Sequence, residues 1–233
     1  MITLLNIETS GETCSVAISQ DGQIEFERFE YEGMNHARVL APFVEEGMGW
    51  LRRHDILPDA IAVSIGPGSY TGLRIGLSMA KGLCVGLDKP LIGISTLQLL
   101  ATEAMFTHTI WEGDELLVPM IDARRMEVYT AAYDFALNPV LAPQPMILEN
   151  DSFQNLLSDR KLIFIGEGAI KAKELIHSDN ARFLTKIRPM ASGMMPLGEK
   201  AFKDKNFIDI AYSVPEYLKE FQATTPKNKV LNK

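Results

Sequence analysis

Hydrophobic and polar positions divide the first half of the chain into three strands followed by alternating helices and strands. Apolar runs and two-residue alternation predict strands, whereas apolar positions three and four residues apart predict helices. The predicted strands are residues 2–9, 14–19, 24–31, 60–65 and 91–94, and the predicted helices are 35–53, 71–86 and 96–105. The Asp21-Gly22 pair is a tight-hairpin signal, so the first three strands form an antiparallel meander. Pro42 suits a first helical turn, which predicts that the first helix starts near Leu40.

The second half of the chain repeats this order. Its predicted strands are residues 116–121, 126–133, 140–148 and 161–165, and its predicted helices are 152–157 and 169–176. Pro143 and Pro145 confine the third of these strands to a sheet edge. Two successive β-β-β-α-β-α halves indicate an α/β protein with an internal duplication. We expect an N-terminal lobe at 1–105, a C-terminal lobe at 106–223 and a frayed tail at 224–233.

Composition narrows the class of protein. The chain has 233 residues, a formal net charge of −7 and 46% hydrophobic residues, which suits a folded globular protein. Its acidic balance argues against a protein that holds nucleic acid unaided. The most apolar long stretch, 73–87, contains Arg74 and Lys81 and is too short to span a membrane. Cys14 and Cys84 are expected to be buried, unpaired thiols, and the start lacks a signal-peptide pattern, so we expect a soluble cytoplasmic protein.

Patterns typical of metal or nucleophilic chemistry are missing from the sequence. The four histidines form neither HxxxH nor HExxH, and none has a cysteine at zinc-ligand spacing. No Gly-x-Ser-x-Gly motif is present. We therefore expect no metal site and no catalytic residue.

The most informative motif is GPGSYTGLRIG at residues 66–76, where a buried strand enters a glycine-rich turn and a helix. One interpretation is a cradle for phosphate or carboxylate, because such turns gather backbone N–H groups at a helix N-terminus. The other is a tight turn that lets the helix lie close to the sheet. A P-loop is excluded, since Leu73 and Arg74 follow Gly72 in place of Lys and Ser or Thr. Thr71 is the predicted N-cap.

The helix behind this motif carries two ridges of small residues. One ridge is Gly72, Gly76 and Ala80, and the other is Ser78, Gly82 and Gly86. Each interior glycine costs about 1 kcal/mol relative to alanine, so close packing should offset it. One ridge can face the sheet, which leaves the other for a second helix. The predicted interface residues are Gly72, Arg74, Ile75, Gly76, Met79, Ala80, Gly82, Leu83 and Gly86.

Two further turns follow buried strands. Thr9, Ser10 and Gly11 come after a strand that ends in Glu8, and they suit either a phosphate of a bound nucleotide or an ordinary solvated turn. The segment 165–169 again leads from a strand through glycines into a helix, which by itself is weak evidence. The candidate nucleotide-binding residues are Thr9, Ser10, Gly11, Gly166 and Gly168.

These motifs together resemble the TsaB (YeaZ) family. They are ETS at residues 8–10, GPGSYTGLRIG at 66–76, and IDAR at 121–124 followed by EVY at 127–129. Weaker similarities are HAR at 36–38 and PEYL at 215–218. The resemblance covers nearly the whole chain, although members commonly carry Asp at the position of Glu8.

The resemblance implies the actin-like ATPase fold, which has a ribonuclease H-like motif in each of two related lobes. It also implies a non-catalytic subunit in the synthesis of threonylcarbamoyladenosine, a modified base beside the anticodon of tRNA. The implied partners are TsaD, a paralogue that holds the metal and transfers the threonylcarbamoyl group, and the small ATPase TsaE. Members alone often form homodimers, and the family was once described as a glycoprotease by analogy with TsaD.

Our hypothesis is therefore a scaffold that pairs with a TsaD-like transferase and contacts tRNA only through the complex. It requires no cofactor of its own, and ATP or ADP binding is left open. Where TsaD carries paired metal-binding histidines, this chain has His36 alone, with Leu40 four residues later. The alternative is an independent small-molecule kinase of the same fold, with an adenosine pocket near Gly166 and Gly168. A metallopeptidase would lack ligands.

Overall fold

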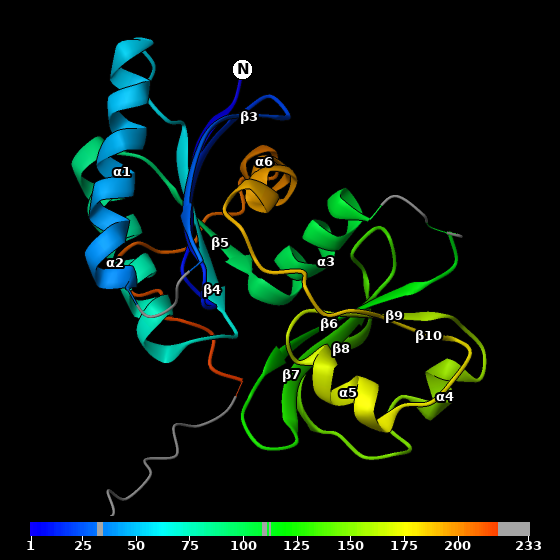
Figure 1. Ribbon diagram of the computed structural model, residues 1–233. Coiled ribbons are helices and arrows are strands. Elements are labelled where there is room, and N and C mark those ends of the chain that lie inside the picture. Colours follow the sequence, from blue (N-terminus) through cyan, green and yellow to red (C-terminus); the bar gives the residue numbers. More distant parts are fainter. Residues whose placement is uncertain (32–34, 109–110, 112, 219–233) are drawn as a thin grey trace, which may run out of the picture.

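The computed structural model describes residues 1–31, 35–108, 111 and 113–218, which form two lobes around two five-stranded sheets (Figure 1). The first sheet has the strand order β3-β2-β1-β4-β5. Its strands are β1 (Thr3–Glu8), β2 (Cys14–Gln20), β3 (Gln23–Glu30), β4 (Ala60–Gly66) and β5 (Leu91–Ser95). Strand β2 runs antiparallel to both β1 and β3, as the hairpin signal predicted, and β4 and β5 run parallel to β1.

The second sheet repeats this arrangement, with the order β10-β9-β6-β7-β8. Its strands are β6 (Leu116–Asp122), β7 (Glu127–Tyr133), β8 (Pro139–Ile147), β9 (Leu162–Ile165) and β10 (Ala181–Leu184). The three antiparallel strands and the two parallel ones correspond one by one to those of the first sheet. The proline-bearing strand β8 lies at an edge, as predicted, because proline cannot donate a ladder hydrogen bond.

Helices cover both faces of these sheets. They are α1 (His36–Arg53), α2 (Tyr70–Leu87), α3 (Thr96–Thr107), α4 (Gln154–Leu157), α5 (Ala169–Leu175) and α6 (Met195–Lys203), with a 3-10 turn η1 at Ser192–Met194. The helices α1 and α2 bury their apolar sides on one face of the first sheet. None of the helices within the described ranges has both the length and the apolar character needed to cross a bilayer.

Helix α3 packs between the two sheets, and α6 from the second half of the chain packs on the first sheet. Leu97, Leu100 and Ala104 of α3 pack with the second sheet. Leu197 of α6 lies in the cluster around Leu4. Chain order alone therefore does not show which sheet a helix packs on. The predicted tail 224–233 lies outside the described residues.

Helix α1 matches the predicted range 35–53, but not the later start that was inferred from Pro42. It begins at His36 and contains Pro42 in its interior, so the predicted start near Leu40 was wrong. Pro42 and Arg38 are both exposed, and water can therefore satisfy the carbonyl that loses its helical partner.

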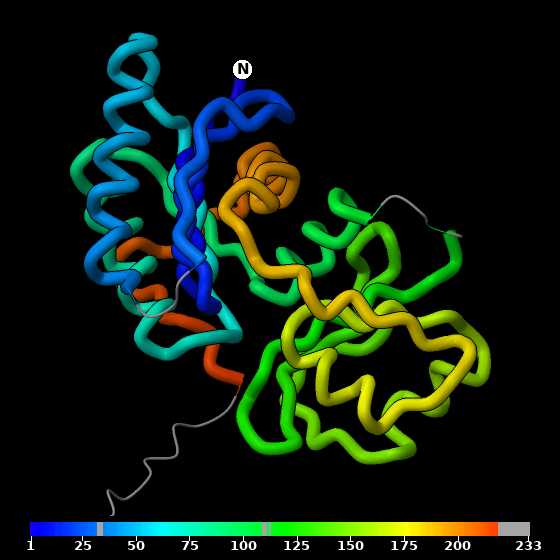
Figure 2. The backbone as a smooth tube through the Cα atoms, viewed as in Figure 1, coloured from blue at the N-terminus to red at the C-terminus, as the bar shows by residue number. Residues whose placement is uncertain are grey.

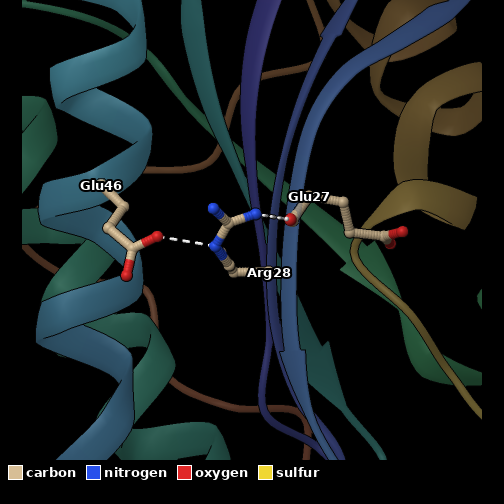
Figure 3. Close-up of polar contacts among 3 residues, drawn as sticks. All are labelled: Glu27, Arg28 and Glu46. Atoms are coloured by element: carbon tan, nitrogen blue, oxygen red, sulfur yellow. Dashed lines mark hydrogen bonds and ion pairs between the residues drawn. The ribbon is translucent and has the colours of Figure 1, made fainter.

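A polar contact ties α1 to the edge of the first sheet (Figure 3). The Arg28 guanidinium of β3 reaches Glu46 of α1 with 2.6 Å between Nε and Oε2, and it also donates to the Glu27 carbonyl O at 2.9 Å. The Glu27 side chain points to the opposite side of the strand. An exposed pair of this kind contributes at most about 1 kcal/mol. The larger contribution to the position of α1 comes from its buried apolar side.

Three other details differ from the sequence prediction. Strand β10 and helix α6 were not predicted, because short or partly exposed segments carry weak periodicity. The N-cap of α2 is Ser69, whose Oγ accepts a hydrogen bond from the Gly72 N–H at 3.2 Å, so the prediction of Thr71 was wrong by two residues. Cys14 and Cys84 are buried and unpaired, as expected.

Candidate functional site

The glycine-rich loop after β4 packs directly on the turn that follows β1. The Ser69 N–H donates to the Ser10 carbonyl O at 2.7 Å, and the Thr9 hydroxyl donates to the Gly72 carbonyl O at 2.8 Å. A Cβ at Gly68 or Gly72 would overlap the backbone oxygens of Ser10 and Thr9. The loop glycines thus permit two backbones to touch. This geometry supports the tight-turn interpretation over the phosphate cradle, because the turn of Thr9 and Ser10 fills the space.

The Glu8 carboxyl group is enclosed by this contact. Its Oε1 accepts a hydrogen bond from the Ser10 N–H at 2.5 Å, and its Oε2 has no hydrogen-bond partner among the described residues. Burial raises the pKa of Glu8 to about 7, and the hydrogen bonds from Ser10 lower it only in part. A buried carboxyl that is partly protonated at neutral pH is poorly suited to hold a metal-bound phosphate.

In the first lobe, the residues predicted to bind nucleotide contact other residues of the same chain. Thr9 and Ser10 are buried, and Gly11 lies against Pro189, whose Cγ is 3.5 Å from an ideal Cβ built on the glycine. The segment that carries Pro189 is fixed by the Ala191 N–H, which donates to the Ser15 Oγ at 2.9 Å.

Gly166 and Gly168 have a packing role in the second lobe. Gly166 has a φ of +96°, and a Cβ there would lie 2.7 Å from the Met120 carbonyl O. The Gly168 N–H donates to the same oxygen at 3.1 Å. Both glycines therefore let α5 start close to β6, and this packing accounts for them without a ligand.

The turns at residues 9–11 and 166–168 nevertheless bring charged residues of the two lobes near one another. Burial raises the pKa of Glu167, and the negative charges of Glu12 and Asp122 add to the effect. The positive charge of Arg188 opposes this rise in the pKa of Glu167, and its Nη2 lies 3.9 Å from the Glu12 Oε2. Asp122 instead pairs with Lys171, at 2.9 Å between Oδ1 and Nζ. Glu12 and Asp122 thus each lie beside a positively charged side chain of the same chain.

The two small-residue ridges of α2 point in different directions around the helix axis. Gly72, Gly76 and Ala80 are buried, and a Cβ at Gly76 would overlap the Thr9 Oγ1. This ridge lies on the chain's own first turn. These contacts within the chain do not favour the predicted role of the three residues in an interface with another chain.

The outer ridge is open. No atom lies within 4 Å of an ideal Cβ at Gly82 or Gly86. Beside this ridge, between α1 and α2, lies a groove of about 720 Å³. Its lining residues are Ala37, Tyr70, Thr71, Arg74, Ile75, Ser78, Met79, Gly82 and Leu83. Five of them, Arg74, Ile75, Met79, Gly82 and Leu83, were predicted as interface residues.

The end of the groove is ordered by a cluster that the sequence did not reveal. The Arg74 guanidinium lies 4.1 Å from the centre of the Tyr70 ring, and its Nε donates to the Tyr217 hydroxyl at 3.0 Å. The rings of Tyr70 and Tyr217 stack with 5.3 Å between their centres. Tyr70 and Arg74 were visible as a pair four residues apart on one helix face, but nothing local linked them to Tyr217.

Metal-ligating side chains do not converge in the part of the chain that the structure describes. No three His, Cys, Asp or Glu side chains there are placed to share an ion. His36 is buried at the start of α1, on the same side as Leu40.

Comparison with known proteins identifies the relatives of this fold. The family model described as "TsaD: tRNA N6-adenosine threonylcarbamoyltransferase" matches residues 30–231. The chain is 31% identical to the tRNA threonylcarbamoyladenosine biosynthesis protein TsaB of Bacillus subtilis, over 95% of this chain and 96% of the relative. It is 30% identical to the protein of the same name from Escherichia coli, over 93% and 94% of the two chains.

Solved structures agree with these sequences. YeaZ from Pseudomonas aeruginosa superposes with a TM-score of 0.77 at 28% identity, over 93% of this chain and all of the other. An uncharacterised Pseudomonas aeruginosa protein with similarity to peptidase YeaZ gives a TM-score of 0.81 at 27% identity, over 94% of this chain and all of the other. The two duplicated lobes are those of the actin-like ATPase fold, and the chain belongs to the TsaB (YeaZ) family of tRNA threonylcarbamoyladenosine biosynthesis proteins.

Proposed function

We propose that this chain is a non-catalytic scaffold that pairs with a TsaD-family transferase in the synthesis of threonylcarbamoyladenosine in tRNA. The observation that carries the proposal is the outer face of α2, where an apolar groove lies beside glycines that leave room for another backbone. The names of the relatives supply the pathway. The match to the TsaD family model supports a partner built on a related fold.

The energetics of α2 favour a contact with a second chain. Gly82 and Gly86 each cost the helix about 1 kcal/mol relative to alanine, and no contact within the described chain offsets that cost. A neighbouring helix could approach closely over these glycines. Docking would also remove Ile75, Met79 and Leu83 from water, which stabilises a complex by about 25 cal/mol for each Å² of apolar surface.

A scaffold role agrees with the chemistry of the described residues. Glu8 is enclosed, and the five residues predicted to bind nucleotide take part in packing. We assign the metal and the transfer step to the TsaD-family partner, so that this chain requires no cofactor of its own. The small-molecule kinase alternative would need an accessible nucleotide site, which these contacts do not favour.

The groove beside α2 would also allow two copies of this chain to associate. In the absence of the partner, a second copy of this chain would cover the groove and give a homodimer. A TsaE-like ATPase would join the pair, and tRNA would meet this chain only within the complex, since a net charge of −7 opposes binding of RNA by the chain alone.

Reconstitution tests this function. The isolated chain should transfer no threonylcarbamoyl group, whereas adding it to the TsaD-family and TsaE-family partners with ATP, threonine and bicarbonate should restore transfer to tRNA. Met79→Glu, which places a charge in the groove, should remove both partner binding and stimulation. Ile170→Glu, on the exposed face of α5, is the control and should retain both.

Two results would contradict the proposal. One is partner activity that does not depend on this chain or that survives Met79→Glu unchanged. The other is phosphorylation of a small molecule by the isolated chain with ATP, which would support the kinase alternative.

A further inference from the structure

The last described residues form a strap along α2, which we define as residues 207–218 (the orange to red tube in Figure 2). Its backbone is fixed at its start, middle and end. The Ile208 N–H donates to the Leu91 carbonyl O at 2.9 Å, and the Glu216 N–H donates to the Ile65 carbonyl O at 2.7 Å. Between them, the Lys81 ammonium of α2 donates to the carbonyl O of Ser213 at 2.7 Å. The strap is therefore a built part of the first lobe.

The strap and the groove lie on either side of the solvent-facing surface of α2. At 100° per residue, positions 70, 74 and 81 fall on one side of Ser78, and positions 75, 79 and 83 fall on the other. Arg74, Lys81 and Tyr70 contact the strap, whereas the opposite flank lines the groove with Ala37 of α1. The open ridge at Gly82 thus runs between α1 and the strap.

The strap meets the groove at one end. Tyr217 stacks on Tyr70 and accepts the hydrogen bond from Arg74, and both of these partners line the groove. Gly66, which has a φ of +123°, lets the strap come close, because a Cβ there would lie 2.7 Å from the Glu216 carbonyl O. The groove and the strap are therefore one continuous surface.

The backbone of the strap makes its contacts, but several of its apolar side chains point to solvent. Tyr212 is 86% exposed and Val214 is 69% exposed, and Val85 on the adjacent part of α2 is 73% exposed. Among the described residues, six of the sixteen exposed large apolar side chains lie on α2 and the strap, which together make up only 30 residues. Single exposed apolar residues need no explanation, but a concentration beside an apolar groove indicates an interaction surface.

We propose that the strap is the second wall of the partner-binding surface, with a helix of the TsaD-family partner lying over Gly82 between α1 and the strap. Tyr212 and Val214 would contact that partner directly, and Tyr217 would hold Tyr70 and Arg74 in place at the end of the groove. This inference rests on the proposed function. It commits to a TsaD-family chain because the strap is continuous with the groove that the proposed function assigns to that partner.

The test combines two exposed substitutions, Tyr212→Ala and Val214→Ala, in the full-length chain. Titration calorimetry with the purified TsaD-family partner should show binding weakened at least tenfold. The melting temperature should stay unchanged, because neither side chain is buried. Ile147→Ala is the matched control, since Ile147 is 65% exposed on β8 of the other lobe, and it should bind like the parent.

The groove variant Met79→Glu separates this inference from the proposed function. If Met79→Glu abolishes binding and the double variant binds like the parent, the strap has no part in the interface, although the scaffold role stands. If neither variant weakens binding, both proposals are wrong. Should the double variant lower the melting temperature, Val214→Ser alone provides the same comparison, and parental affinity of that variant would overturn the inference. The inference would also be overturned if the double variant lost self-association but bound the TsaD-family partner like the parent.

Discussion

The two ridges of small residues on α2 have similar composition and different surroundings. The inner ridge of Gly72, Gly76 and Ala80 packs on the turn at Thr9, with no room for a larger side chain. The outer ridge of Ser78, Gly82 and Gly86 leads into open space. Small residues four apart thus indicate close approach of a backbone without saying which backbone approaches. Five substitutions test this difference.

The largest effect is expected for Gly76→Leu. The new side chain would collide with Thr9. Because the Thr9 hydroxyl is held by its hydrogen bond to Gly72, neither Thr9 nor the leucine could move aside without a large cost in free energy. We expect the free energy of unfolding to fall by at least about 4 kcal/mol, or folding to fail. Urea denaturation of the purified variant measures this. A variant with parental stability that has only lost self-association would show that the inner ridge is an interface after all.

Glu8→Gln probes the closed turn beneath the inner ridge. The pKa of Glu8 is about 7 in the folded chain against 4.5 for the free side chain, so folding favours the protonated form. That contribution is complete below pH 4.5 and is lost as pH rises through 7. Glutamine stays neutral, and the variant should therefore gain stability relative to the parent as pH rises, by up to about 3 kcal/mol at pH 8.

Denaturant melts of parent and variant between pH 5 and pH 8 check this prediction. The control is Glu46→Gln, which removes a carboxylate from the exposed pair with Arg28 and should change the free energy of unfolding by at most about 1 kcal/mol. A constant difference between Glu8→Gln and the parent across this range would mean that Glu8 is charged in the folded chain.

Gly82→Leu tests the outer ridge. Because nothing lies within 4 Å, the free energy of unfolding should change by less than about 1 kcal/mol. Binding to the TsaD-family partner should weaken about a hundredfold, which equals about 2.7 kcal/mol, because the partner helix could no longer approach. Melting temperature and titration calorimetry on the same preparation separate the two quantities. Parental affinity would place the partner elsewhere.

The smallest effects are expected for a matched pair of alanine substitutions. Gly86→Ala should raise the free energy of unfolding by up to about 1 kcal/mol, since alanine is the better helix former and meets no neighbour. Gly72→Ala should lower it, because the methyl group would overlap the Thr9 carbonyl O. Changes of the same sign in thermal melts would mean that the two ridges do not differ in their surroundings.

Local patterns predicted most of the fold. Hairpin and strand signals located nine of the ten strands that the described residues form, and the repeated order of elements indicated the duplication that the two sheets display. The family followed from the motif at 66–76. The sequence could not show that α3 contacts both sheets or that α6 packs on the first sheet, because an apolar helix face does not specify which sheet it will cover.

Patterns along the chain were enough to predict most of the elements, the family and the two ridges on α2, because spacing along one helix fixes which residues share a face. Only the tertiary structure decided which ridge is buried. The rotation of α2 about its axis is set by contacts with Thr9 and Ser10, more than fifty residues earlier, and by the strap at Tyr217. Such contacts leave no local periodicity in the chain, and for this reason the groove at Tyr70 and Arg74 became visible only when distant segments were brought together.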